Sequence, residues 1–264
     1  VLSIFLIVQY SNYHQAMFGN SANRITGKVN EQYNKIEYYF QLKRTNDSLL
    51  KANEMLYNKL ASNFNLPDSG SKQVIDTIKI DSIAQYRKFN YLSAKVVANS
   101  ITTQSNFVVL QSANAAQMRV GMGIVDPNNS VVGAITEING EFVVVMSLLH
   151  KDSRISGKLL KTGETGTVLW DGKYPNLVTL SGIPKSTKIA KGDSVITSGF
   201  STIFPKGLLI GRIDEVFLEK STNNFKIVVR TAANFHNLEY AYAINNSQQP
   251  VIDQLIKNAE KISK

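Results

Sequence analysis

Apolar side chains recur at helical spacing between residues 21 and 64, a stretch that contains no proline and only one glycine, Gly27. Leucines at positions 42, 49 and 56 follow one another every seven residues, and asparagines occupy the flanking core position of the same heptads. Leucine at d with asparagine at a favours two parallel helices, because buried asparagines satisfy each other in only one register. The pattern predicts a coiled-coil helix over residues 21–64. The self-association residues it predicts are Leu42, Asn46, Leu49, Asn53, Leu56 and Leu60. The alternative is a single amphipathic helix packed on its own domain.

The segment Asn65–Ser71 contains proline and glycine among polar residues and ends the helical pattern. We interpret residues 65–90 as a linker. From residue 91 the chain changes to short β-branched runs separated by turn signals such as Asn139-Gly140 and Asp171-Gly172. No helical period of ten or more residues intervenes, which argues against a doubly wound parallel sheet. We predict one small barrel over residues 91–164 and a second over residues 165–246. The prediction leaves open whether strands of the second region pair with the first barrel.

A glycine-rich stretch from Lys191 to Ile213 is typical of short strands joined by sharp turns. A weak internal repeat relates this stretch to an upstream one. The upstream segments are Val120–Val125 and Val132–Ile135, and they resemble Ala190–Ile196 and Ile210–Ile213. In both copies a turn glycine precedes one strand and a second glycine lies early in a later strand. Two related modules are therefore expected. The residues predicted to shape their turns are Gly121, Gly133, Gly192, Gly199, Pro205, Gly207 and Gly211.

The two ends of the chain differ from its middle. The N-terminal run is almost entirely apolar, and its apolar members are Val1, Leu2, Ile4, Phe5, Leu6, Ile7 and Val8. A spanning helix needs about 20 such residues. We therefore expect residues 1–20 to comprise the end of a membrane anchor and a juxtamembrane segment, in a chain cut at its N-terminus. The alternatives are a signal-peptide core and a buried strand. Residues 247–264 form a tail with apolar residues at helical spacing, which we expect to be a disordered end rather than a docked helix.

The amino-acid composition excludes several classes of function. The 264 residues carry a net charge of +9, with 43% hydrophobic residues and no cysteine. Disulfides, iron–sulfur clusters and thiol catalysis are thereby excluded within this chain. The basic residues are scattered and form no run of five, so a soluble basic surface is favoured over a nucleic-acid groove.

The residues most suggestive of catalysis form the sequence His150-Lys151-Asp152-Ser153. Adjacent residues of a strand point to different faces, so this order does not predict a catalytic triad. Gly121-Met122-Gly123 lacks the third glycine and the helix of a phosphate-binding loop. No metal or cofactor is expected, and the chain is predicted not to be an enzyme. The alternatives are a protease-like enzyme using Ser153 or Ser201 and a nucleic-acid-binding β module.

Several segments together resemble the bacterial rod-shape-determining MreC family. They are Val120–Val125, Val132–Ile135, Asp152–Ile155, Lys191–Gly199 and Ile203–Gly211, within a similarity that spans residues 1–244. Asn114–Arg119 lacks a glycine that such proteins often carry.

This resemblance implies a mainly β fold in which a coiled-coil helix precedes two six-stranded barrels of chymotrypsin-like architecture without the triad. It also implies a single-pass inner-membrane protein with its bulk in the periplasm, which self-associates as a scaffold of cell-wall elongation. The partners it implies are MreD, RodA, the actin-like MreB across the membrane and the elongation penicillin-binding transpeptidase.

Overall fold

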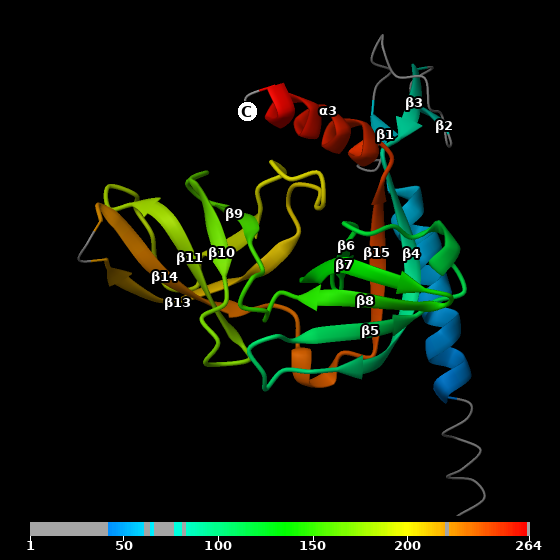
Figure 1. Ribbon diagram of the computed structural model, residues 1–264, viewed down its shortest axis with the longest axis horizontal. Coiled ribbons are helices and arrows are strands. Elements are labelled where there is room, and N and C mark those ends of the chain that lie inside the picture. Colours follow the sequence, from blue (N-terminus) through cyan, green and yellow to red (C-terminus); the bar gives the residue numbers. More distant parts are fainter. Residues whose placement is uncertain (1–41, 61–63, 66–76, 81–82, 220–221, 263–264) are drawn as a thin grey trace, which may run out of the picture. The chain divides into compact units, whose positions relative to one another are not determined.

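The structure is a computed structural model that describes residues 42–60, 64–65, 77–80, 83–219 and 222–262 (Figure 1). Residues 42–59 are helical. Three short strands follow, β1 (Phe64–Asn65), β2 (Thr77–Ile80) and β3 (Ile83–Arg87), and they pair antiparallel in the order β1-β3-β2. The segment predicted as a linker over residues 65–90 therefore contains a small sheet, and β4 begins within it at Phe89.

The first barrel closes with six antiparallel strands in the order β4-β5-β8-β7-β6-β15. Their bounds are β4 (Phe89–Asn99), β5 (Phe107–Gln111), β6 (Gly123–Val125), β7 (Val131–Asn139), β8 (Phe142–Ser147) and β15 (Tyr240–Asn246). The last strand comes back from the far end of the sequence to pair with β4 and β6. A 3-10 turn at Ala115–Gln117 precedes β6, and another at Phe235–Asn237 precedes β15.

The second barrel closes in the order β9-β10-β11-β14-β13-β12. Its strands are β9 (Ile155–Leu159), β10 (Thr165–Leu169), β11 (Leu177–Pro184), β12 (Ser194–Thr197), β13 (Leu209–Leu218) and β14 (Asn224–Thr231). Two six-stranded barrels in a mainly β chain confirm the predicted fold class. The predicted boundary at residues 164/165 is wrong by one strand, because β9 pairs with β10 and β12 rather than with the first barrel.

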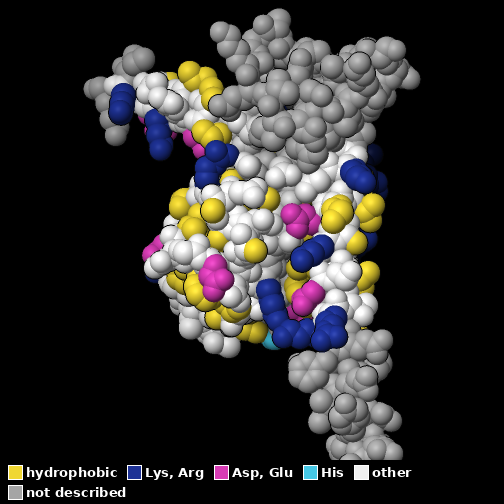
Figure 2. All heavy atoms as spheres, turned by 90° about the vertical axis from the view of Figure 1, so that its right-hand side faces the viewer, with side chains coloured by type: hydrophobic (Ala, Val, Ile, Leu, Met, Phe, Trp, Pro, Cys, Tyr) yellow, Lys and Arg dark blue, Asp and Glu magenta, His cyan; other side chains and the backbone are white. Residues whose placement is uncertain are grey.

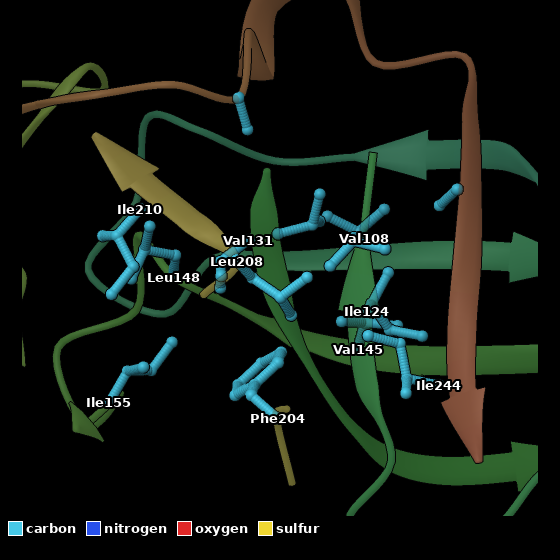
Figure 3. Close-up of a cluster of buried hydrophobic side chains, with 14 of the residues drawn as sticks. Val108, Ile124, Val131, Val145, Leu148, Ile155, Phe204, Leu208, Ile210 and Ile244 are labelled. Carbon is cyan, nitrogen blue, oxygen red and sulfur yellow. The ribbon is translucent and has the colours of Figure 1, made fainter. Parts of the chain in front are cut away.

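Alternating burial along the strands builds the two interiors. In β9, for example, Ile155, Gly157 and Leu159 point inward and the residues between them are half-exposed, as the two-residue period of a strand requires. Figure 3 shows buried side chains of both barrels in one cluster, including Val131 and Val145 of the first and Leu208 and Ile210 of the second. The hydrophobic core therefore continues from one barrel into the other.

The two barrels repeat one hydrogen-bond pattern. The N–H of Gly121 donates to the carbonyl of Ile135, and the N–H of Gly192 donates to that of Ile213, both at 2.8 Å. The two glycines have nearly equal positive φ angles, 88° and 89°. The weak internal repeat of the sequence therefore corresponds to a structural repeat.

Two of the glycines predicted to shape turns have a different role. Gly133 and Gly211 lie inside β7 and β13, where a Cβ would stand 2.1 Å from the carbonyl oxygen of Met146 or Arg230 on the neighbouring strand. They are glycines because adjacent backbones approach closely. Among the other predicted turn residues, Gly199 and Gly207 have positive φ, and Pro205 lies in the loop between them.

The C-terminal tail is a helix, α3 (Gln249–Ile262), and the expectation of a disordered end is wrong. Its first two turns are bonded to both barrels through Gln249 and Asp253, which gives the segment the tertiary contacts that a short helix needs. Among the described residues, none of the helices is both long and apolar enough to cross a membrane. The predicted anchor residues, Val1 to Val8, lie outside the described residues.

Candidate functional site

The helical residues after Leu49 dock on the first barrel through an aromatic cluster. The Tyr57 ring stacks on Tyr91 of β4 and meets Tyr242 of β15 edge-on, with centroids 5.3 Å apart in both pairs. The Tyr57 hydroxyl donates to the carbonyl of Pro127 at 2.7 Å. Figure 1 shows the part of the blue helix that follows Leu49 alongside β4 and β15. Tyr57 therefore joins the helix to three segments of the barrel.

Polar contacts fix the same helix face in register. The Asn58 side chain pairs with the backbone of Tyr91, accepting from its N–H at 2.6 Å and donating to its carbonyl at 2.9 Å. Ser93 donates to the Glu54 carboxylate, and the Tyr242 hydroxyl donates to the Leu50 carbonyl at 3.1 Å. Because Asn58 mimics a strand partner for β4, the helix is held by directional bonds as well as by packing.

Burial of the two barrel tyrosines changes their acidity. Desolvation, reinforced by the nearby Tyr57, raises the pKa of Tyr91 to about 12. The pKa of Tyr242 also rises to about 12, chiefly through desolvation. The docked state therefore requires both phenols to be neutral.

The heptad leucines lie on a different face of the helix from the docked one. Leu42, Leu49, Leu56 and Leu60 are exposed, and Leu56 retains 62% of its accessible surface. Asn53 is half-buried and hydrogen-bonds with the Tyr242 hydroxyl, so its side chain contacts the first barrel. Its predicted role in self-association stays a prediction. Asn46 is half-buried. The structure thus combines the two sequence alternatives, with one face packed on the domain and the leucine stripe left uncovered.

The glycine-rich motif of the second barrel forms the contact between barrels. Phe204, in the β12–β13 loop (residues 198–208), packs against Gly123 of β6, where a Cβ would stand 2.4 Å from its ring. Figure 3 places the Phe204 side chain among the buried residues of the first barrel. The Leu209 N–H donates to the Asn129 carbonyl, and Asn246 donates to the Thr202 carbonyl at 3.0 Å. Gly123 is therefore a packing glycine that admits this phenylalanine.

A cleft of about 630 Å³ lies beside this contact. The first barrel contributes Ile135, Thr136 and Met146 to its walls, and the second contributes Thr167 of β10 and residues of the loop. Its surface is mainly apolar with hydroxyl groups along it. Phe200 lies between two lining residues, Gly199 and Ser201, and is 80% exposed. A large exposed aromatic next to an apolar cleft is typical of a protein-binding surface.

The His150 cluster beside the cleft has the wrong geometry for acyl transfer. His150 Nδ1 accepts the backbone N–H of Asp152 at 3.0 Å, whereas a triad histidine donates its Nδ1–H to the carboxylate. The ring is buried and packs edge-on against Phe107. Ser153 N–H donates to the His150 carbonyl, and the Ser201 hydroxyl accepts the N–H of Ile203, so both serines belong to local turns. In the described residues, no group of His, Asp and Glu is arranged to hold a metal.

Charge on the visible surface is mixed. Figure 2 shows Lys and Arg side chains interspersed with Asp and Glu and with apolar side chains on one face. Lys191 and Arg230 both pair with Asp214, and these two cations lower the pKa of its carboxyl group. On the face shown in Figure 2, positive charge is therefore interspersed with negative charge and apolar surface.

Sequence reasoning did not single out Phe200 or the tyrosine cluster. Phe200 lies among apolar and glycine residues in the sequence, where an aromatic side chain is normally expected to be buried. Its exposure depends on the path that the loop takes toward the other barrel. Tyr57 carried a usable signal, because it lies three residues after Glu54 and next to Asn58 on a helix whose leucines occupy another face. That combination indicates a second contact surface.

The fold thus consists of two closed six-stranded β-barrels with a common hydrophobic core, a helix docked on the first barrel and a cleft at the contact between the barrels. A family model, "Rod shape-determining protein MreC, barrel core", matches residues 96–245. The chain belongs to this family, whose members are structural shape-determining proteins and not enzymes.

Known relatives agree with this assignment. The cell shape-determining protein MreC of Listeria monocytogenes is 23% identical over 173 residues, which cover 64% of this chain and 58% of that protein. The solved Listeria monocytogenes MreC structure has a TM-score of 0.56 at 20% identity and covers 86% of this chain and 96% of that one. A solved complex between Penicillin-Binding Protein (PBP2) and MreC from Helicobacter pylori matches with a TM-score of 0.50 at 17% identity, over 61% and 99% of the two chains. These structural likenesses show the fold.

Proposed function

We propose that this protein is a membrane-anchored periplasmic scaffold of the cell-wall elongation machinery, and that it binds the elongation penicillin-binding transpeptidase at the cleft between its barrels. The observation that carries the proposal is the exposed Phe200 beside an apolar cleft of about 630 Å³. The Helicobacter pylori relative solved in complex with PBP2 supports a transpeptidase as the partner.

The cleft suits a protein side chain better than a small polar substrate. Its apolar walls come from Ile135 and Met146, and its rim offers hydroxyl groups and the charged pair Asp152 and Arg154. Binding hot spots are aromatic or arginine side chains surrounded by groups that exclude water. Phe200 with the cleft beside it has this composition, so an apolar side chain of the partner fills the cleft while Phe200 packs on the partner's surface.

The test measures binding of the purified chain to the soluble domain of the elongation transpeptidase from the same cell. Phe200→Ala is expected to raise the dissociation constant at least about tenfold, because truncated hot spots cost about 2 kcal/mol or more. Tyr174→Ala is the matched control, since Tyr174 is an exposed aromatic of the same barrel outside the cleft lining. Equal affinities of Phe200→Ala and the unchanged chain would place the transpeptidase elsewhere.

Self-association is proposed to use the leucine stripe. Leu42, Leu49 and Leu56 are exposed at heptad spacing on a helix whose other face is docked. Pairing two such stripes removes apolar surface from water without disturbing Tyr57. Leu49→Glu combined with Leu56→Glu is expected to convert a dimer into a monomer in analytical ultracentrifugation. Asn46→Leu is expected to change oligomer order, since a buried asparagine restricts register. A chain that is monomeric before and after these changes contradicts this part of the proposal.

The apolar run at residues 1–8 supports the proposed membrane anchor, and the periplasmic domain structure solved for an MreC protein supports a periplasmic location of the barrels. MreD, RodA and MreB are proposed as further members of the same assembly. Crosslinking in intact membranes followed by identification of the captured proteins tests this placement. Recovery of the transpeptidase with MreD or RodA is the expected result, and capture of no wall-synthesis protein would count against the scaffold.

A further inference from the structure

The last strand of the first barrel leads directly into helix α3. Asn246 ends β15, and α3 begins at Gln249. Figure 1 shows α3 (red) next to the yellow β12–β13 loop, to which it is hydrogen-bonded. This loop carries Phe200, the exposed aromatic residue beside the cleft. The segment that follows the first barrel therefore reaches the loop that forms part of the proposed binding site.

Thr202 of this loop is held by two long-range hydrogen bonds. The Asn246 side chain donates to the Thr202 carbonyl at 3.0 Å, and the Thr202 hydroxyl donates to the Asp253 carboxylate at 2.8 Å. Asn246 is buried and also accepts the N–H of Gln248 at 3.1 Å, which fixes the orientation of its amide group. Because Thr202 lies two residues after Phe200, these bonds restrain the backbone next to the exposed ring.

The same helix is bonded to the wall that the first barrel contributes to the cleft. The buried Gln249 side chain donates to the Gly121 carbonyl at 3.0 Å, and Gly121 lines the cleft. The turn at Gly121 is held by the barrel, since its N–H donates to the carbonyl of Ile135 at 2.8 Å. Helix α3 therefore connects a fixed turn of the first barrel to the Phe200 loop of the second.

The loop has two further fixed points, one on each side of Phe200. Before it, the Ser198 hydroxyl donates to the hydroxyl of Ser156 at 2.7 Å. After it, Phe204 is buried against Gly123 of the first barrel. The two bonds of Thr202 lie between these points, so they act on the part of the loop that carries the exposed ring.

We propose that Asn246, Gln249 and Asp253 are positioning residues for the cleft, which hold the loop so that Phe200 projects beside it and thereby raise the affinity for the protein partner. A loop already held in its binding conformation loses less entropy when the partner binds. This inference rests on the proposed function, because it concerns the same binding site. It extends the site to a segment beyond residues 96–245, the part of the chain that the family model matches.

Hydrogen bonds have a large share in holding α3 in place. Its apolar side chains Val251, Leu255 and Ile256 are exposed, so they contribute little packing against the barrels. The bond between Thr202 and Asp253 is charge-assisted, and both side chains are half-buried. Its loss is therefore expected to shift the equilibrium between the held and the released loop about tenfold, the low end for a bond to a charged group.

Amide hydrogen exchange in the whole chain tests the attachment without a partner. Exchange in residues 199–203 is expected to rise about tenfold in Asp253→Ala and in Thr202→Val, and no further in the double variant, because all three lose the same bond. Asp253→Asn keeps an acceptor for the Thr202 hydroxyl and is expected to stay within about threefold of the unchanged chain. Gln254→Ala, at an exposed neighbouring position of α3, is the control. Unchanged exchange in Asp253→Ala would overturn the proposal.

Binding to the soluble domain of the elongation transpeptidase measures the consequence for the cleft. Gln249→Ala combined with Asp253→Ala is expected to raise the dissociation constant at least about threefold, because the binding-competent fraction falls. If this double variant binds as tightly as the unchanged chain while Phe200→Ala weakens binding, the positioning role is refuted and the transpeptidase site stands. If neither variant changes the affinity although loop exchange rises, the transpeptidase site is refuted, and the exchange still supports attachment of the loop by α3.

Discussion

Removal of the Tyr57 ring is expected to detach helical residues 50–59 from the first barrel while both barrels stay folded. Tyr57→Phe removes the hydrogen bond to Pro127, which is worth about 1 kcal/mol. Tyr57→Ala also removes two ring pairs at about 0.5–1.5 kcal/mol each and part of the buried apolar surface of a half-buried side chain. The total loss is about 3 kcal/mol, which shifts the docking equilibrium by about 100-fold.

Amide hydrogen exchange measured by mass spectrometry reads this equilibrium directly, because local opening exposes the backbone of the helix. Exchange in residues 50–59 is expected to rise about 100-fold in Tyr57→Ala and about fivefold in Tyr57→Phe, from the free energies above. Met55→Ala is the control, since Met55 is exposed on the same helix and alanine keeps its helix propensity. Strand β5 is expected to keep its protection in all three variants.

Two results would refute this reasoning. If exchange of residues 50–59 in Tyr57→Ala stays within about threefold of the unchanged protein, the aromatic cluster does not hold the helix. If β5 loses protection together with the helix, Tyr57 supports the whole barrel instead of the docked segment alone.

Two further outcomes follow from backbone packing and from acidity. Gly133→Ala and Gly211→Ala are each expected to lower the free energy of unfolding, measured in urea, by about 3 kcal/mol, because a Cβ would stand 2.1 Å from a carbonyl oxygen. As a control, Gly140→Ala is expected to lower it by only about 1 kcal/mol, since Gly140 has a φ of 58° and open space around it. Since folding raises the pKa of Tyr91 and Tyr242 from 10.0 to about 12, the stability that their neutral forms contribute is complete below pH 10 and is lost as pH rises through 12. Urea unfolding on both sides of pH 10 measures that loss, and a flat profile would contradict it.

The barrel modules were predictable because their signals are local. A turn glycine such as Gly121 or Gly192 needs positive φ, and this requirement is visible in the sequence as glycine before a β-branched run. The internal repeat between the two modules was predictable for the same reason. The roles of Gly133 and Gly211 were not, because the oxygen that excludes a Cβ belongs to a distant strand.

The boundary between the two barrels could not be predicted from the order of the strands along the chain. Strand β9 follows directly after the first barrel in sequence, and its pattern fits either barrel. Only closure decides its place, since β9 completes the hydrogen bonds of β10 and β12. The return of β15 to β4 was allowed for but not required by the sequence.

By itself, the sequence determined the β character of residues 91–246, the two-module organisation and the helix with a heptad leucine stripe, because periodicity and turn chemistry act over a few residues. The tertiary structure decided which faces remain uncovered. It turned Asn53 toward Tyr242 and left Leu56 exposed, brought Phe204 to Gly123 of the other barrel, and fixed α3 by its polar side. These outcomes depend on residues that are far apart in the chain. Packing energy decides which face of an amphipathic helix is buried, and a local sequence pattern carries no information about that energy.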